Sequence, residues 1–449
     1  MKKFIALALT LSALIACSDA NVNKPTKVEE PVPQKAQAVR SIDDIATDYV
    51  KLVLSVGQFD ADVVDAYYGP GSLKPAPVQE GAHFPFQAFN KQAEDLMQAV
   101  SEIDVNTLSQ EQQARLAMFQ KQVRAVHTKI NMLGGETYSF DEEAQLLYDA
   151  LPPNNDLSYF DALLNELDAL LPGEGELSER YNAFNSQFII PKDKIDVVFR
   201  AAIEEARQRT SEHITLPENE SFVLEYVTDK AWSGYNYYQG NAQSLIQINI
   251  DLPIYISRAV DLAAHEGYPG HHVFNVLLEQ NLVNKKEWIE FSVYQLFSPQ
   301  SLIAEGSANY GIDVAFPGES RLAFEKEVLF PLAGLDTSKA ELYYKVADIY
   351  SKLSYVGNEA ARQYLNGEIN ADAAADILQK YMLNSPERAA QRVRFFDKYR
   401  SYVINYNLGR DLVESYVIRQ GGTENNTQKR WTIFEELLSN PKTASMISE

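Results

Sequence analysis

The stretch Asp261-Leu-Ala-Ala-His265-Glu266-Gly267-Tyr268-Pro269-Gly270-His271-His272 decides which class of protein this chain belongs to. The 449-residue chain has six histidines, and three of them fall between positions 265 and 272. A glutamate directly follows the first of the three. Imidazole nitrogens and carboxylate oxygens are the usual ligands of a catalytic zinc ion. The stretch therefore predicts a metal site.

The spacing of these histidines differs from the His-Glu-x-x-His helix of zinc proteases, in which two histidines four residues apart share one face. Proline occupies position 269 instead. On a regular helix His271 would lie about 240° round from His265, and His272 would lie roughly 10.5 Å along the axis. Pro269 cannot donate a backbone hydrogen bond, and the flanking glycines loosen the backbone. We therefore expect the helix, predicted to begin near Leu252, to be distorted between His265 and His271.

A third ligand is expected from another part of the chain, and Glu305 is the best candidate because it lies on an apolar helical stretch. Asn309 follows one turn later and would orient the Glu305 carboxylate. Asp261 lies one turn before His265 and would accept the second ring hydrogen of that histidine. The alternative for Glu305 is a partly buried acid held in an ion pair.

Composition restricts the classes of partner. The formal net charge of -22 argues against binding to nucleic acid, since the phosphate backbone would be repelled. With 45% hydrophobic and 23% charged residues, the chain has the composition of an ordinary soluble protein. No obligate protein partner is indicated.

The first residues are similar to the signal of a bacterial lipoprotein. Two lysines precede an apolar run over residues 4–16 that is too short to span a bilayer, and Leu14-Ile15-Ala16-Cys17 resembles a lipobox. That resemblance implies cleavage before Cys17, a lipidated cysteine and, because Ser18 follows, anchoring to the outer membrane with the protein facing the periplasm. Cys17 is the only cysteine, so no disulfide can form within the chain. An ordinary secretory signal with a chance cysteine is the alternative.

The pattern of the whole chain predicts a mainly α protein with a small β-sheet. Strand patterns occupy residues 221–227 and 244–250, and the aromatic stretch 232–240 between them is expected to be a loop. No later segment has the uninterrupted apolar length of a membrane helix. The predicted organisation is a signal peptide (1–16), a flexible tether (17–40), a helical N-terminal lobe (41–215) and a catalytic lobe with the small sheet and C-terminal helices (216–449).

Several motifs match one known family. They are His265-Glu-x-x-Pro-Gly-His-His272, Glu305-Gly-x-Ala308, Phe140-Asp-Glu-Glu-Ala144, Trp232-Ser-Gly-Tyr-Asn-Tyr-Tyr238 and Tyr406-Asn-Leu-Gly409. With these motifs the chain resembles the bacterial domain-of-unknown-function family numbered 885, grouped with the zincin-like metallopeptidases. The resemblance covers most of the chain beyond the tether, and its first motif is the most specific.

This resemblance implies a zincin-like architecture of the gluzincin type, in which two histidines and a downstream glutamate bind zinc. Carried over to this chain, His265, His271 and Glu305 would be the ligands and Glu266 the general base. His271 is preferred to His272 because the Pro-Gly break directly precedes it. The other histidine would line the cleft or support the ligands. The family supplies no substrate.

A tyrosine stripe near the C-terminus would complete the site. Tyr399, Tyr402 and Tyr406 recur at spacings of three and four, so they would share one helical face and supply the group that stabilises an oxyanion, with Tyr406 as the candidate. Arg410 follows one turn later and would pair with a substrate carboxylate. Core packing with satisfied hydroxyls is the alternative for the stripe.

The predicted function is a zinc-dependent peptidase that acts on short peptides, because the helical N-terminal half would roof the cleft. The strand at 244–250 would offer its edge to an extended peptide, through Ile248 and Asn249. Zinc would be the cofactor, and the membrane would hold the acylated Cys17. Two alternatives stay open: a binding or scaffold lipoprotein that kept the fold and lost catalysis, and a zinc amidase that acts on cell-wall fragments.

Overall fold

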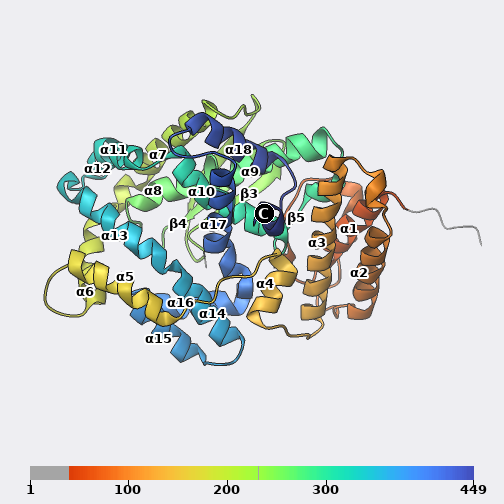
Figure 1. Cartoon of the computed structure of the whole chain (residues 1–449), viewed down its shortest axis with the longest axis horizontal. Coiled ribbons are helices and arrows are strands. Elements are labelled where there is room, and N and C mark those ends of the chain that lie inside the picture. Colours follow the sequence, from red (N-terminus) through yellow and green to blue (C-terminus); the bar gives the residue numbers. More distant parts are fainter. Residues whose placement is uncertain (1–39, 231, 449) are drawn as a thin grey trace, which may run out of the picture. The chain divides into compact units, whose positions relative to one another are not determined.

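The protein is described by a computed structural model that covers residues 40–230 and 232–448 (Figure 1). The described residues form one compact unit. This unit is mainly helical with two small sheets, which confirms the predicted mainly α fold with a small β component. The predicted signal peptide, Cys17 and the predicted tether up to residue 39 lie outside the described residues. None of the helices within the described ranges has the length and apolar character that crossing a membrane requires.

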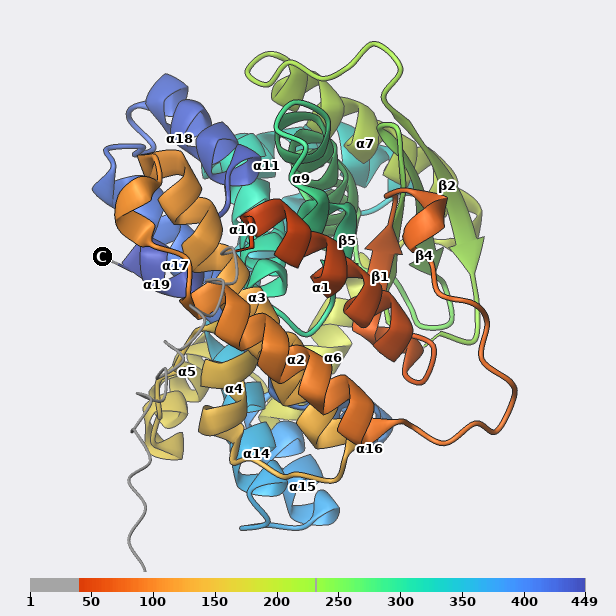
Figure 2. The same cartoon turned by 90° about the vertical axis from the view of Figure 1, so that its right-hand side faces the viewer.

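Three helices near the N-terminus, α1 (Ile42–Val56), α2 (Phe86–Ser101) and α3 (Gln110–Leu133), pack around a core of their own (Figure 2). Helix α1 has a side-chain cap at its N-terminus. The hydroxyl of Ser41 accepts a hydrogen bond from the amide of Asp44 at 3.2 Å and so caps the first turn. The apolar side of α1 is buried against the other two helices and the segment 289–295, which is typical of an amphipathic helix.

The strands form two separate sheets. They are β1 (Val64–Tyr67), β2 (Ser221–Val227), β3 (Gly234–Gly240), β4 (Gln243–Asn249) and β5 (Val293–Gln295). Strand β1 pairs antiparallel with β5, while the other sheet has the order β2-β4-β3. Strand β4 is parallel to β2 and antiparallel to β3. The strand predicted at 221–227 is confirmed, and the one predicted at 244–250 is shifted by one residue.

The expected loop at 232–240 is wrong, because residues 234–240 form β3. The side chain of Asn236 and that of Tyr238 are buried on one face, whereas Tyr237 between them is only partly buried. Burial therefore alternates from one side chain to the next, as expected for a strand that pairs along its length with β4. The aromatic and glycine content that suggested a loop therefore belongs to a strand.

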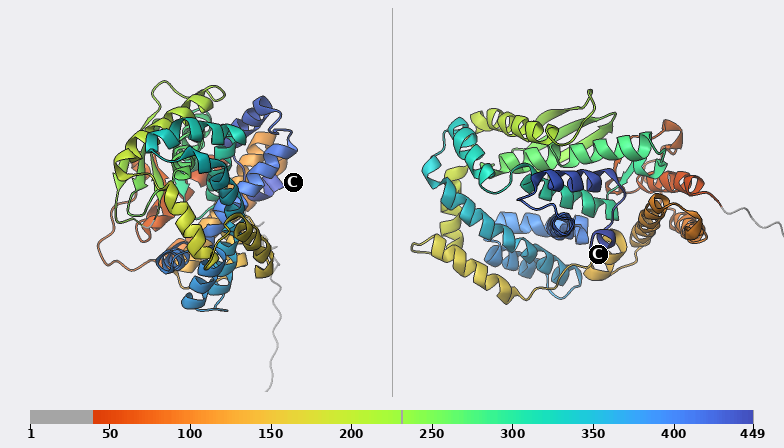
Figure 3. Two further views of the ribbon diagram at one scale, coloured as in Figure 1. Left: turned by 90° about the vertical axis from the view of Figure 1, so that its left-hand side faces the viewer. Right: turned by 45° about the horizontal axis from the view of Figure 1, so that its top comes forward.

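Helix α7 (Ile195–Ser211) packs against β2 of the three-stranded sheet (Figure 3). The hydroxyl of Tyr226 on β2 donates to Asp196 at 3.2 Å, and its ring lies 6.2 Å from the ring of Phe199. The largest group of buried side chains combines residues from both sides of position 215, where a lobe boundary is predicted. Contacts therefore join the two predicted lobes across that position.

Helix α10 (Pro299–Ala315) and helix α17 (Ile404–Arg419) pack along each other in the main core. The other helices are α4 (Phe140–Tyr148), α5 (Leu157–Leu170), α6 (Leu177–Asn185), α8 (Ser257–Leu262), α9 (His271–Leu278), α11 (Glu319–Phe324), α12 (Phe330–Ala333), α13 (Ala340–Lys352), α14 (Val356–Leu365), α15 (Ala371–Tyr381), α16 (Pro386–Tyr399), α18 (Thr427–Ser439) and α19 (Ala444–Ser448). The central residues of the candidate site lie on α9, α10, α16 and α17 and on the π-helical segment Ala263–Gly267 that follows α8.

Candidate functional site

The helix that carries His265 ends before His271. Helix α8 continues as a π-helical segment over Ala263–Gly267, Tyr268 is extended, and α9 begins at His271. The predicted distortion between the two histidines is confirmed. The predicted helix start near Leu252 is wrong, because α8 begins five residues later at Ser257.

Gly270 allows the chain to turn back on itself. Its amide donates to the carbonyl oxygen of Ala264 at 2.9 Å, so the backbone passes directly over the end of the π-helical segment. A Cβ at position 270 would lie 2.0 Å from the carbonyl oxygen of His265. Because no side chain fits there, the turn that brings His271 back toward His265 requires glycine.

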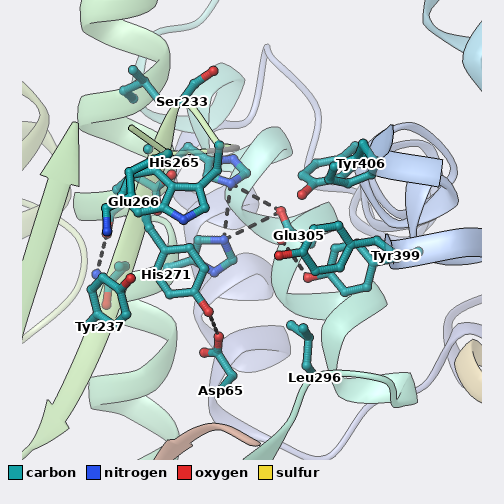
Figure 4. A pocket seen from close by; sticks show the side chains of 18 of the residues that line it. Asp65, Ser233, Tyr237, His265, Glu266, His271, Leu296, Glu305, Tyr399 and Tyr406 are labelled. Carbon is teal, nitrogen blue, oxygen red and sulfur yellow. Dashed lines mark hydrogen bonds and ion pairs between the residues drawn. The ribbon is translucent and has the colours of Figure 1, made fainter. Parts of the chain in front are cut away.

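The turn places two imidazoles beside Glu305 of α10 (Figure 4). The Nε2 atoms of His265 and His271 lie 3.1 Å apart. Oε2 of Glu305 lies 3.2 Å from the first nitrogen and 3.6 Å from the second. Ligand atoms about 2.0–2.1 Å from a tetrahedral zinc ion would be about 3.3 Å from one another. The three edges of this triangle therefore have the length that a shared zinc ion requires.

The surroundings of Glu305 also fit a cation. Its Oε2 atom is buried and lies within ion-pair distance of both imidazoles, but within the described part of the chain it accepts no hydrogen bond. Burial alone would raise the pKa of this carboxyl group, but His271 and His265 hold the pKa well below its usual range. A buried carboxylate oxygen without a partner is costly unless a positive charge compensates it. Two imidazoles and a carboxylate are a donor set that zinc accepts, so His265, His271 and Glu305 fit this metal.

Residues behind the triangle hold its members in place. The ring Nδ1 of His265 lies 3.0 Å from Oδ1 of Asn309, and the amide of Asn309 donates to the carbonyl oxygen of Tyr406 at 2.8 Å. The hydroxyl of Tyr402 donates to Oε1 of Glu305 at 2.8 Å. Such partners fix the orientation of metal ligands.

Two of the predicted supporting roles are wrong. Asn309 orients His265 and not Glu305, because the latter carboxylate is held by Tyr402. Asp261 does not reach the ring of His265. Its two oxygens instead pair with Arg321 at 2.7 Å and Arg258 at 3.2 Å, so it belongs to an ion-pair cluster beside the site.

Glu266, the predicted general base, lines the same cavity as the triangle. Its side chain is buried, and burial raises the pKa of its carboxyl group. The side-chain amide of Asn236 on β3 donates to its backbone carbonyl oxygen at 2.7 Å. Among the described residues, none forms a hydrogen bond with the Glu266 carboxylate. The group is thus positioned by its backbone, while its carboxylate stays free to contact a ligand.

The three tyrosines of the predicted stripe all line the cavity, but they do not lie on one helix. Arg400 has a φ of 51° and ends α16 directly after Tyr399, so Tyr402 lies in a short 3-10 turn and Tyr406 in α17. The hydroxyl of Tyr406 points toward the triangle in Figure 4, and the described chain offers it no hydrogen-bond partner. Burial and the charge of Glu305 raise the pKa of this phenol.

His272 faces away from the triangle. Its ring is fully buried, with Nδ1 at 2.8 Å from the hydroxyl of Ser244 and Nε2 at 3.1 Å from Glu220. Glu220 also accepts hydrogen bonds from Tyr268 at 2.6 Å and Arg207 at 2.8 Å. His272 therefore neither lines the cleft nor supports the ligands directly. It ties α9 to the sheet.

The predicted substrate contacts on β4 and at Arg410 are wrong. Strand β4 lies in the middle of its sheet and offers no edge, Ile248 is buried, and the side chain of Asn249 donates to the carbonyl oxygens of Lys230 and Trp232. Arg410 is surrounded by carboxylates, with Asp313 at 2.7 Å, Glu414 at 2.9 Å and Asp411 at 3.3 Å. These carboxylates neutralise the charge of Arg410, so the guanidinium is not available to a substrate carboxylate.

The cavity has a volume of about 900 Å³, and some of its lining lay beyond sequence reasoning. Asp65 of β1 accepts a hydrogen bond from the hydroxyl of Tyr235 on β3. Burial raises the pKa of Asp65 to about 6, against the lowering by this hydrogen bond and by the charge of His271. Asp65 lies far from the histidines in the sequence, so no local pattern points to it. The alternating aromatic residues of β3 were the available signal for Tyr235.

No family model matches this chain, and no curated protein matches it. The resemblance to the family numbered 885, and the zincin-like relation that it implies, therefore stay predictions.

Three solved structures are similar to this chain, and the first of them supports the fold. A protein from Colwellia psychrerythraea, described as a candidate lipoprotein, matches with a TM-score of 0.50 at 14% identity, over 81% of this chain and 68% of that one. A candidate lipoprotein of unknown function from Shewanella oneidensis matches with a TM-score of 0.46 at 14% identity, over 81% and 72% of the two chains. A structure named BsuCP matches with a TM-score of 0.44 at 9% identity, over 89% of each chain. At such identities the likeness to the first of these concerns the fold alone.

Proposed function

We propose that this chain is a zinc-dependent peptidase that hydrolyses short peptides. The observation that carries the proposal is the triangle of His265, His271 and Glu305, whose edges of 3.1, 3.2 and 3.6 Å suit one zinc ion. Glu266 lies in the same cavity, and none of the described residues forms a hydrogen bond with its carboxylate. Two imidazoles, one carboxylate and a second glutamate as base are the parts of a hydrolytic zinc site. These parts, together with the motif at 265–272, also favour membership of the family numbered 885 and a gluzincin-type relation.

Zinc held by the triangle would supply a Lewis acid and lower the pKa of a bound water to about 7. Glu266 would accept a proton from the attacking water and deliver it to the nitrogen of the leaving amine. The raised pKa of the buried Glu266 carboxyl suits both roles, since a group that ionises nearer to neutrality gains and loses a proton more readily.

Tyr406 would stabilise the charge that develops on the peptide oxygen. Its hydroxyl points toward the triangle, and burial keeps it protonated, so it has a hydrogen to donate. Tyr402 has a different role, because its hydroxyl is already committed to Glu305. It would position the ligand and would not touch the substrate.

Strand β3, in place of β4, would orient the peptide. In the order β2-β4-β3 it is an edge strand, and its residues from Gly234 to Tyr237 line the cavity. An extended peptide could therefore pair with its backbone and lie across the triangle. The cavity is also lined by Ala61, Asp62, Val64 and Asp65 and by α16, and this enclosure supports short peptides as the proposed substrates.

We further infer that Cys17 is acylated and anchors the protein to the outer membrane, facing the periplasm. Support comes from the lipobox-like residues 14–17 and from the Colwellia and Shewanella proteins, both described as candidate lipoproteins. Incorporation of labelled palmitate into the wild type but not into Cys17→Ser would test the acylation.

The peptidase proposal is tested by digestion of a peptide library with the zinc-loaded wild type and with Glu266→Gln. The expected result is cleavage by the wild type and loss of cleavage by the variant at equal zinc content. Equal cleavage by both proteins would remove Glu266 from its role. A wild type that binds zinc and library peptides without cleaving them would favour the binding lipoprotein, and cleavage confined to cell-wall amides would favour the amidase.

A further inference from the structure

One face of helix α16 forms a cationic wall of the cavity. The residues of this face that line the cavity are Arg388, Gln391, Arg392, Phe395, Lys398 and Tyr399. Their spacing of three and four places them on the same side of the helix. A chain with a net charge of -22 thus presents three cations along one face of a single cavity.

Two of these three cations have no carboxylate as an ion-pair partner. Lys398 pairs with Asp62 at 3.1 Å. Neither Arg388 nor Arg392 forms an ion pair within the described part of the chain. Elsewhere the cavity arginine Arg258 is neutralised by Asp261. On the α16 side of the cavity the unpaired positive charge is therefore concentrated at Arg388 and Arg392, while Lys230, which also lines the cavity, lies over the ring of Trp232.

Arg392 is held in place by neighbouring rings, but one of its hydrogen-bond donors lacks an acceptor. Its guanidinium lies 4.9 Å from the ring centroid of Phe395 and 5.7 Å from that of Phe396, so two aromatic rings fix its position. Its Nε atom is buried and has no hydrogen-bond partner among the described residues. A buried guanidinium donor without an acceptor is costly, and arginine suits planar carboxylates because two of its N–H groups can bind both oxygens.

Tyr406 connects this wall to the candidate metal site. Besides burial, the charge of Glu305 raises the pKa of its phenol and the charge of Arg392 lowers it, so both charges lie within electrostatic reach of the same hydroxyl. Around the triangle the carboxylates of Asp65, Glu266 and Glu305 lie within electrostatic reach of one another. An anionic group would be repelled from these acids and attracted to α16.

We propose that Arg392, assisted by Arg388, binds a carboxylate of the ligand and thereby sets the direction in which a peptide lies in the cavity. The identification of the ligand as a peptide rests on the proposed function; carboxylate binding by α16 does not require cleavage. The carboxylate belongs to the free C-terminus or to an acidic side chain, and these two sources are separated by the choice of peptide.

The test measures equilibrium binding in the Glu266→Gln protein, in which turnover is blocked. Three tetrapeptides labelled at the amino end are compared by fluorescence anisotropy: tetra-alanine with a free C-terminus, its C-terminal amide, and an amide with glutamate at the third position. We expect at least one carboxylate-bearing peptide to bind about tenfold or more tightly than the neutral amide. Preference for the free acid assigns the C-terminus, and preference for the glutamate peptide assigns the side chain.

Adding Arg392→Gln should reduce this preference to about twofold or less, and Arg392→Lys should restore part of it. Arg394→Gln is the matched control, because Arg394 lies exposed on the same helix and does not line the cavity; it should keep the full preference. Arg388→Gln serves as the second variant if Arg392→Gln does not fold. Equal binding of all three peptides, or a preference that survives both Arg392→Gln and Arg388→Gln, would overturn the proposal. Because the experiment measures binding without turnover, the carboxylate-binding proposal can fail although the wild type cleaves peptides, and it can hold although no cleavage is observed.

Discussion

Gly306 of α10 and Gly409 of α17 bring the two helices into direct backbone contact. A Cβ on Gly306 would lie 2.4 Å from the carbonyl carbon of Gly409, and a Cβ on Gly409 would lie 2.7 Å from the carbonyl oxygen of Leu302. Neither position has room for a side chain. The contact lets Glu305 and Tyr406, neighbours of these glycines on the two helices, reach the same cavity.

Gly306→Ala should therefore destabilise the fold by about 1–3 kcal/mol, because the added methyl group forces the helices apart. The free energy of unfolding, measured by urea denaturation, checks this. Gly71→Ala is the control, since nothing lies within 4 Å of a Cβ at that position; its effect should stay within about 0.5 kcal/mol. Equal stability of the two variants would contradict the close contact.

Tyr402→Phe should weaken zinc binding by about 10–100-fold, because it removes the hydrogen bond that orients Glu305. Competition with a zinc chelator measures this affinity. Tyr399→Phe is the control from the same group of tyrosines, as Tyr399 has no hydrogen bond to a ligand in the described chain; its zinc affinity should match the wild type. Unchanged affinity in Tyr402→Phe would show that the hydrogen bond does not position Glu305.

Tyr406→Phe should lower kcat by about 10²–10³-fold while zinc content stays unchanged, because a transition-state hydrogen bond is lost. Steady-state kinetics on a peptide identified by the library digest, with zinc measured in the same sample, separates this from the effect of Tyr402→Phe. A rise in KM at constant kcat would instead assign Tyr406 to substrate binding.

Glu220 should make the stability of the fold depend on pH. Burial alone would raise the pKa of its carboxyl group, but hydrogen bonds from His272, Tyr268 and Arg207 lower the pKa from 4.5 to about 2. A carboxyl group whose pKa falls on folding stabilises the native state above its unfolded pKa. That stabilisation, up to about 3 kcal/mol, is lost as the pH falls from about 4.5 toward 2.

Glu220→Gln should accordingly be less stable than the wild type at pH 7, and the two stabilities should converge as the pH is lowered. Urea denaturation between pH 3 and pH 7 measures the difference. A constant difference across this range would mean that the carboxylate is not held in its charged form.

The sequence predicts those parts of this site that depend on local chemistry. Pro269 and Gly270 predict a break in any helix, and the break is present. The Pro-Gly break also favours His271 over His272 because it directly precedes His271, whose Nε2 atom lies 3.1 Å from that of His265. Glu305 was found because a carboxylate on an apolar helix is uncommon.

The contacts that sequence reasoning missed all depend on pairing between distant segments. The middle position of β4 follows from its pairing on both sides, which no local pattern encodes. Asp261 lies one helical turn from His265, yet Arg321, distant in the sequence, captures its carboxylate. Arg410 is likewise neutralised by Asp313 of another helix. Long-range ion pairs thus engage the side chains of Asp261 and Arg410, although the local spacing of both residues suggests a role in the site.

The central claim is that His265, His271 and Glu305 hold one zinc ion. Its most direct test is the zinc content of the purified protein, by mass spectrometry after dialysis at neutral pH, in the wild type and in His265→Ala, His271→Ala and Glu305→Ala. His127→Ala is the control, because His127 lies on α3 and bonds to Asn90 outside the cavity. We predict one zinc per chain in the wild type and in His127→Ala, and its loss from each of the other three variants. A wild type without zinc, or zinc that survives all three substitutions, would contradict the account.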